Sequence, residues 1–214
     1  SINFAGTNFD RFSLNPNGYI VMGPTIVYDL YNILCSGRGS GRNNVISALT
    51  TDLHSNNNCS SGGAGSVQYL TTGTAPNRVL TVQWKNIGLF ANASLCMNFQ
   101  IKLYETTNKV EIVYGSFDLS ASTTRNFQVG IAGSSECDFL VRQVTSSGSW
   151  AASTSGLTAC ANCFASSTIK PASGLTYTFD YGTATCASCC PPSNTTSSNV
   201  TGGTATISWT ASNS

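Results

Sequence analysis

The stretch MNFQIKLYETTNKVEIVY, residues 97–114, decides the fold class of this chain. Its first half alternates apolar and polar residues, the period of a strand with one buried face. Residues 105–108, ETTN, favour a turn, and residues 109–114 alternate again, so the stretch predicts an antiparallel hairpin. The residues expected on its buried face are Met97, Phe99, Ile101 and Leu103.

The same period continues on both sides of this hairpin. Upstream, FSLNPNGYI at residues 12–20 contains Asn-Gly, a strong signal for a tight turn between two strands. Further alternating runs occur at 78–84, 127–131 and 175–181, residues 45–49 are typical of a buried strand, and helical periodicity is nearly absent. We therefore expect an all-β protein, with an antiparallel β-sandwich of jelly-roll or immunoglobulin-like type over residues 1–185.

The composition indicates a secreted protein. Hydrophobic residues make up 41% of the 214 residues and charged residues 9%, against roughly 25% in typical soluble domains. The net charge is +1 and there is no basic stripe, so nucleic acid is not an expected partner. No stretch approaches the roughly 20 apolar residues of a membrane span, and SINF at residues 1–4 already resembles a strand, as in a mature or trimmed product.

The cysteines support an oxidising, extracellular location. Proximity favours a Cys35–Cys59 disulfide, and the five cysteines from Cys160 to Cys190 are expected to pair largely with each other. Their number is odd, so one thiol is free or pairs with another chain. Each disulfide typically contributes about 2–4 kcal/mol to stability. The nine positions are Cys35, Cys59, Cys96, Cys137, Cys160, Cys163, Cys186, Cys189 and Cys190.

Residues 186–192, CASCCPP, form a linker, because two prolines cannot donate to a strand ladder and stiffen the chain. The tail that follows, residues 193–214, contains no charged residue. Its alternating positions are Ala205, Ile207 and Trp209, which predicts a strand.

Two parts of the chain resemble known families. Residues 1–182 resemble β-sandwich modules of large secreted cell-surface proteins from Bacteroidota, in FSLNPNGYI (12–20), VQYLTTG (67–73), VQWKN (82–86) and FQIKLYETTN (99–108). This resemblance implies surface display with adhesion or assembly, and no catalytic residues. Residues 191–210, PPSNTTSSNVTGGTATISWT, resemble the first two strands of a fibronectin type III domain.

These two features suggest a way for copies to join. Such modules are expected to have strand material ahead of the Asn-Gly hairpin, and here little remains before Phe4, which would leave a groove with free backbone groups at a short N-terminal edge of the sandwich. A strand from the tail of a neighbouring copy would fill that groove by donor-strand complementation, and repeated donation would give a filament. The donor residues are Thr204, Ala205, Thr206, Ile207, Ser208, Trp209 and Thr210.

Catalysis and metal binding are the weaker interpretations. His54 and Asp52 share a strand face, but no motif selects a nucleophilic serine. A glycosidase needs two carboxylates facing one cleft, and Glu105 and Glu111 flank one turn, but ion pairs with lysines 102 and 109 across the strands are favoured. Cys-x2-Cys pairs at 160/163 and 186/189 have zinc spacing, yet the secreted character favours disulfides. We predict no enzyme activity, cofactor or metal.

The sequence therefore predicts an extracellular structural protein whose partners are copies of itself. The alternative is a glycan-binding, lectin-like adhesin module, since lectins often present exposed aromatic and carboxylate side chains on loops. The candidate ligand residues are Trp150 and Asp138, together with the Asn-rich loop at 56–58.

Overall fold

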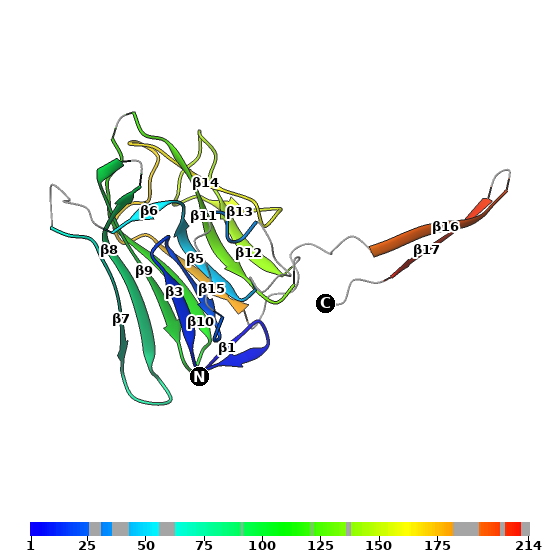
Figure 1. The fold of residues 1–214 in the computed structure, drawn as a ribbon, viewed down its shortest axis with the longest axis horizontal. Coiled ribbons are helices and arrows are strands. Elements are labelled where there is room, and N and C mark those ends of the chain that lie inside the picture. The colour runs from blue at the N-terminus through cyan, green and yellow to red at the C-terminus, as the bar shows by residue number, and fades with distance from the viewer. Residues whose placement is uncertain are drawn as a thin grey trace.

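The computed structural model describes residues 1–25, 31–35, 43–55, 63–90, 92–120, 122–135, 138–181, 193–201 and 204–210. These residues form antiparallel sheets and no α-helix, which confirms the predicted all-β sandwich (Figure 1). Within the same residues, no helix is long and apolar enough to cross a membrane.

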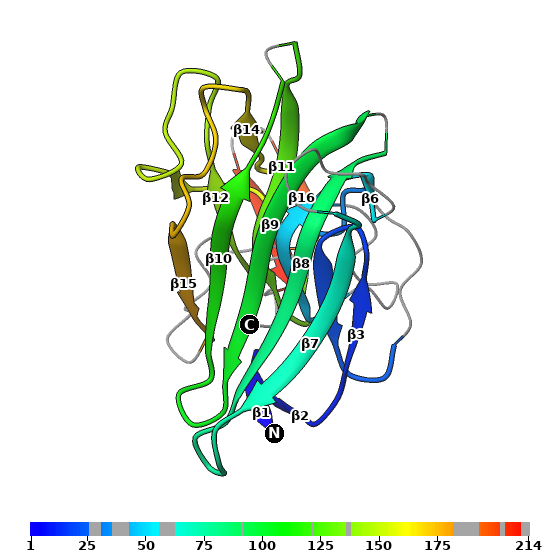
Figure 2. The same ribbon diagram turned by 90° about the vertical axis from the view of Figure 1, so that its left-hand side faces the viewer.

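The first sheet has six strands, and β8 pairs with three of the others. One side of β8 pairs with β9, and the other pairs first with β7 and then with β6. The order β15-β10-β9-β8 leaves β15 at one border and β7 at the other (Figure 2). The strands are β6 (Leu53–His54), β7 (Ser66–Thr72), β8 (Val79–Leu89), β9 (Asn92–Tyr104), β10 (Lys109–Phe117) and β15 (Thr176–Asp180).

The predicted hairpin at residues 97–114 is confirmed as β9 and β10. Val110 pairs with Leu103 and Tyr114 with Phe99, in the register that the alternation requires. Met97, Phe99, Ile101 and Leu103 are all buried. At the turn, Asn108 adopts a φ of 55°, a left-handed conformation that Asn tolerates better than most residues.

The second sheet has seven strands in the order β13-β12-β11-β5-β4-β3, with β14 pairing alongside β11. Gly18 in the β3–β4 turn has a φ of +85°, and a Cβ there would lie 2.8 Å from the Leu49 carbonyl oxygen, so this position requires glycine. The strands are β3 (Phe12–Asn15), β4 (Tyr19–Met22), β5 (Val45–Thr50), β11 (Arg125–Ala132), β12 (Phe139–Gln143), β13 (Thr154–Ser155) and β14 (Cys163–Ala165).

Aromatic rings fill the space between the two sheets. Trp84 of β8 stacks on Phe99 of β9 with ring centroids 5.2 Å apart. Trp150, which follows β12, stacks on Tyr177 of β15 and meets Tyr114 of β10 edge-on at 5.3 Å. Burial of rings this large dominates the energetics of a core.

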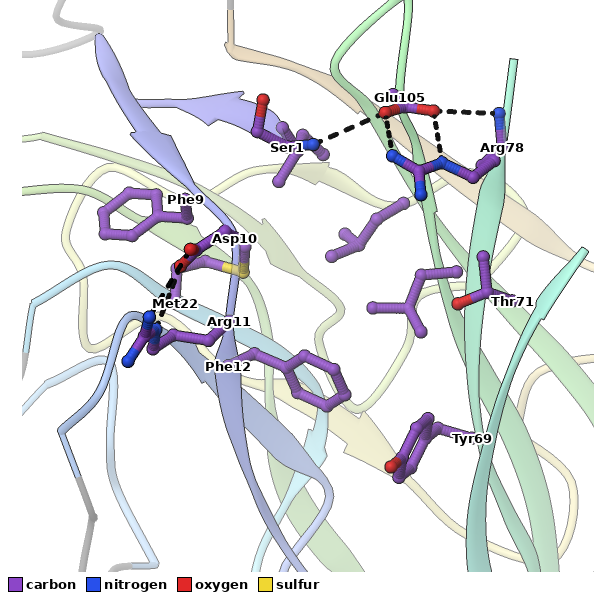
Figure 3. Close-up of a pocket in the computed structure, with 13 residues that line it drawn as sticks. Ser1, Phe9, Asp10, Arg11, Phe12, Met22, Tyr69, Thr71, Arg78 and Glu105 are labelled. Atoms are coloured by element: carbon purple, nitrogen blue, oxygen red, sulfur yellow. Dashed lines mark hydrogen bonds and ion pairs between the residues drawn. The ribbon is translucent and has the colours of Figure 1, made fainter. Parts of the chain in front are cut away.

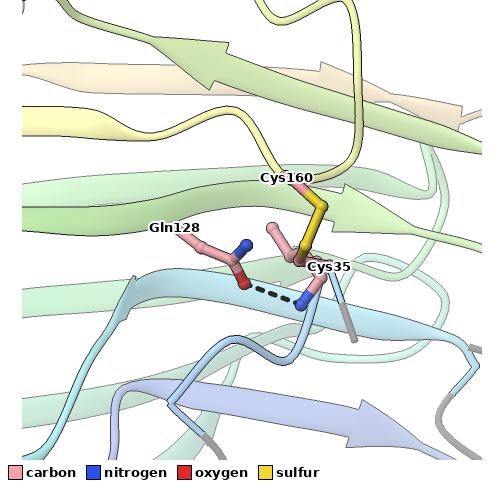
Figure 4. Close-up of a disulfide and its surroundings, with 4 residues drawn as sticks. Cys35, Gln128 and Cys160 are labelled. Atoms are coloured by element: carbon pink, nitrogen blue, oxygen red, sulfur yellow. Dashed lines mark hydrogen bonds between the residues drawn. A yellow bond between two sulfur atoms is a disulfide. The ribbon is translucent and has the colours of Figure 1, made fainter. Parts of the chain in front are cut away.

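A second apolar cluster covers the outer face of the second sheet, so β5 is buried on both faces. A disulfide between Cys35 and Cys160 joins the two segments that cover it (Figure 4). Gln128 of β11, also buried, accepts a hydrogen bond from the Leu34 N–H at 2.9 Å. The cluster contains Tyr19, Val21, Ile33, Leu34, Val45, Ala132, Phe139, Val141 and Ala161.

This disulfide corrects the predicted pairing, which joined Cys35 to Cys59 and kept Cys160 within the C-terminal group. Cys35 and Cys160 are 125 residues apart, and only the fold brings them together. Cys163 was also expected in a disulfide but is a buried free thiol. Cys96 is disulfide-bonded. The remaining cysteines, at positions 59, 137, 186, 189 and 190, lie outside the described residues.

Two short hairpins complete the described chain. β1 (Ile2–Phe4) pairs with β2 (Thr7–Phe9), and Phe4 lies in the core. β16 (Ser193–Thr201) pairs with β17 (Thr204–Thr210) in a separate two-stranded sheet, seen apart from the sandwich in Figure 1. The predicted donor strand is therefore half of a hairpin and not a lone strand. The linker at 186–192 lies outside the described residues.

Candidate functional site

The border strand β7 has a longer run of exposed residues than any other strand of the described sandwich. All five residues from Gln68 to Thr72 are exposed, including Tyr69 at 64% and Leu70 at 63%. Proteins usually protect a border strand with a charge, a proline, a bulge or a covering loop. The sequence SVQYLTT has no charge and no proline, and its register with β8 has no bulge.

The ladder determines which backbone groups of β7 face outward. Tyr114 of β10 exchanges backbone hydrogen bonds with residues 174 and 175, on the side of β15. In an antiparallel sheet, hydrogen-bonded and non-hydrogen-bonded pairs alternate across each strand. Tyr114 lies opposite Phe99, Phe99 opposite Trp84, and Trp84 opposite Val67. Phe99 therefore bonds to Trp84, and Val67 directs its N–H and C=O away from β8.

Because backbone groups along a strand alternate in direction, every second residue of β7 has the same orientation as Val67. Tyr69 and Thr71 also direct their N–H and C=O groups to the open border, and no strand in the described part of the chain pairs with that border. These residues share a face with the core positions of the sheet, so their side chains point towards the second sheet. β7 therefore offers both backbone groups and a side-chain surface to an incoming strand.

A groove of about 390 Å³ lies between β7 and the first strands of the chain (Figure 3). Phe12 of β3 and Tyr69 of β7 both line it, and their rings contact each other edge-to-face with centroids 5.7 Å apart. Its inner surface is largely apolar, from Ile2, Phe9, Met22, Leu80 and Leu103.

An ion pair lies at one end of this groove. Arg78 donates from Nε to Glu105 Oε2 at 2.8 Å and from Nη2 to Oε1 at 2.5 Å. The hydrogen bond from the guanidinium lowers the pKa of Glu105 to about 2, so the carboxylate stays charged at neutral pH. The sequence predicted a lysine partner for Glu105, whereas the partner is Arg78, which immediately precedes the paired strand β8.

The residues predicted to bind a ligand do not form a surface site. Trp150 is only 2% exposed, and its Nε1 donates to the Phe164 carbonyl at 3.0 Å. It is a core residue and presents no face to a sugar, so its prediction as a ligand residue is wrong. Asp138 accepts a hydrogen bond from the Tyr181 hydroxyl at 2.6 Å. Residues 56–58 lie outside the described residues.

The residues considered for catalysis and zinc binding have structural partners. Glu111 pairs with Lys109 at 2.7 Å, as the sequence predicted. The His54 ring lies 5.9 Å from the ring of Phe90. Cys160 is in a disulfide and cannot act as a thiolate ligand, and burial raises the pKa of Cys163 to about 12. Among the described residues, no group of three or more metal-ligating side chains occurs.

Comparison with known proteins identifies the family of this chain. The chain matches the NIDO-related family over residues 1–181, which cover the whole sandwich, and it belongs to that family. This domain and the disulfide indicate an extracellular type of protein. No curated protein and no solved structure matches the chain.

The residues of β7 were not predicted to form a site, although VQYLTTG is among the stretches that carry the family resemblance. A signal was present in that stretch. Adjacent large apolar residues, Tyr69 and Leu70, interrupt the alternation in a segment with no charge. Since neighbouring residues point to opposite faces, such a pair implies that both faces of the strand are apolar.

Proposed function

We propose that this protein is an extracellular structural subunit that joins neighbouring copies by β-strand addition, with β7 as the acceptor and residues 204–210 as the donor. The observation that supports this most is the unprotected border of β7, where Val67, Tyr69 and Thr71 present free backbone groups. An added strand would satisfy these groups with main-chain hydrogen bonds. Head-to-tail addition of this kind does not close on itself and gives a filament.

The properties of the tail support its role as donor. β17 pairs with β16 along one side, which leaves its other side for a further strand. A hairpin of two strands is marginally stable by itself in water, so packing onto a sheet would stabilise it. Glycan binding stays an alternative prediction, but the burial of Trp150 removes its main aromatic candidate.

The test is a proline that blocks the border without unfolding it. Thr71→Pro removes an N–H that faces outward, a position where border strands tolerate proline. Thr71→Ala keeps the N–H and is the matched control. We expect the full chain and Thr71→Ala to form filaments in electron micrographs and large species in sedimentation. Thr71→Pro should stay monomeric with unchanged circular dichroism, and a chain lacking residues 193–214 should also stay monomeric.

Two outcomes would contradict the proposal. If the unmodified chain is monomeric at every concentration tested, the protein does not self-assemble. If Thr71→Pro assembles as well as Thr71→Ala does, β7 is not the acceptor. Glycan-array binding by a monomeric chain would then favour the adhesin alternative.

A further inference from the structure

The open border of β7 and the groove are next to each other. Val67, Tyr69 and Thr71 direct their N–H and C=O groups to the open border, and the side chains of Tyr69 and Thr71 line the groove on the inner face of the sheet. In an antiparallel pair, residues directly opposite each other point to the same face of the sheet. A strand that bonds to this border therefore places every second side chain on the inner face, beside the groove.

The groove has the chemistry of a receptor for large apolar side chains. The buried residues Ile2, Met22 and Leu103 line it, together with the touching rings of Phe12 and Tyr69 (Figure 3). Its volume, about 390 Å³, is within the range of roughly 300–1,000 Å³ typical of binding pockets. Aromatic side chains pack well edge-to-face against such rings.

The tail of the chain has the matching pattern. Ala205, Ile207 and Trp209 recur at every second position of β17, and residues i and i+2 of a strand are about 6.6–6.8 Å apart. In the hairpin register, Ile207 lies opposite Ser197. Neither β17 nor β7 contains a charged residue, so neither strand repels the other through charge.

We infer that the groove between β3 and β7 receives Ile207 and Trp209 from the β17 strand of a second copy. This inference rests on the proposed function and adds to it the side chains that give the contact its specificity. Backbone hydrogen bonds along β7 would accept many extended segments, whereas the groove selects a strand with large apolar residues at alternate positions.

The structure offers a matched pair of variants to test the groove. Tyr69 and Leu70 are neighbours, exposed at 64% and 63%, and they point to opposite faces of β7. Tyr69→Ala removes a ring from the groove lining, while Leu70→Ala changes the outer face only. We expect Tyr69→Ala to weaken self-association of the full chain about tenfold, as loss of an aromatic anchor does, and Leu70→Ala by less than about threefold.

The same comparison is available on the donor. Trp209→Ala should weaken association about tenfold and Ser208→Ala by less than about threefold. If the two rings touch, the Tyr69→Ala/Trp209→Ala double variant should be weakened by less than the product of the two single effects. Sedimentation equilibrium over a concentration series measures all of these variants.

The outcomes separate this inference from the proposed function. If Thr71→Pro abolishes assembly while Tyr69→Ala and Trp209→Ala leave it unchanged, strand addition is supported and the groove inference is wrong. If Tyr69→Ala weakens assembly and Trp209→Ala does not, the groove receives another segment and the assignment of Trp209 is overturned. If Thr71→Pro leaves assembly unchanged, the proposed function and the inference both fail.

Discussion

Strands β5 and β7 have similar sequences and opposite environments. VISALT in β5 and SVQYLTT in β7 are both uncharged mixtures of aliphatic and hydroxyl residues. Every residue of β5 is buried, whereas β7 exposes five consecutive residues. β5 lies between β4 and β11 under two apolar clusters, while β7 has a neighbour on one side only. Composition makes both segments strands, and their place in the sheet determines which one is available to a partner.

This contrast also explains the placement of the disulfide. A sheet that is apolar on both faces needs a cover on its outer face, and residues 31–35 and 159–161 contribute to that cover. The Cys35–Cys160 bond ties these two segments to each other. The border at β7 has no such cover among the described residues, as expected for a surface that binds another chain.

The largest effect should come from the aromatic core. Trp150→Ala should lower the free energy of unfolding by about 3–5 kcal/mol, because the substitution leaves a cavity among Tyr114, Phe127 and Tyr177. Tyr69→Ala, the exposed counterpart on β7, loses its edge-to-face contact with Phe12 and should change it by only about 0.5–1.5 kcal/mol. Urea unfolding of monomeric protein, followed by circular dichroism, measures both. Equal losses would contradict the contrast between core and border.

The disulfide should have the next largest effect. Replacing Cys35 and Cys160 together with alanine should destabilise the protein by about 2–4 kcal/mol, because the bond restricts a long loop in the unfolded chain. Cys163→Ala is the control, since it removes a buried thiol that forms no disulfide, and should cost roughly 1 kcal/mol. Thermal unfolding of the two variants compares them. A loss no greater than that of the control would show that the bond does not secure the cover.

The smallest effect concerns the ion pair at the end of the groove. The pKa of Glu105 is lowered to about 2, below its usual 4.5, so its contribution is complete above pH 4.5 and is lost as the pH falls to about 2. Glu105→Gln should therefore lower Tm at pH 7, and the difference from the unmodified protein should shrink across this range. A difference that stays constant from pH 5 to pH 2 would show that the carboxylate does not carry the effect.

Local pattern was sufficient for the hairpins. The alternation at 97–104 and 109–114 predicted β9 and β10 with the correct buried face, and Asn17-Gly18 predicted the β3–β4 turn. These predictions are correct because a strand with one face on the core needs an apolar residue at every second position, and this alternation is visible in the sequence.

Long-range contacts were not predictable in the same way. Proximity along the chain suggested Cys59 as the partner of Cys35, but the fold places Cys160 there. Trp150 lies in a run of small residues typical of an exposed loop, yet that loop folds over the gap between the sheets and buries the ring. In both cases the deciding neighbour is far away in sequence.

The sequence by itself determined that this chain is an all-β protein with sparse charge and an apolar strand period. Only the tertiary structure decided that β5 is central, that β7 is a border, and that Phe12 and Tyr69 meet edge-to-face in the lining of a groove. The physical reason is that the period of a strand is a local property, whereas its neighbours depend on which distant segments bury their faces together.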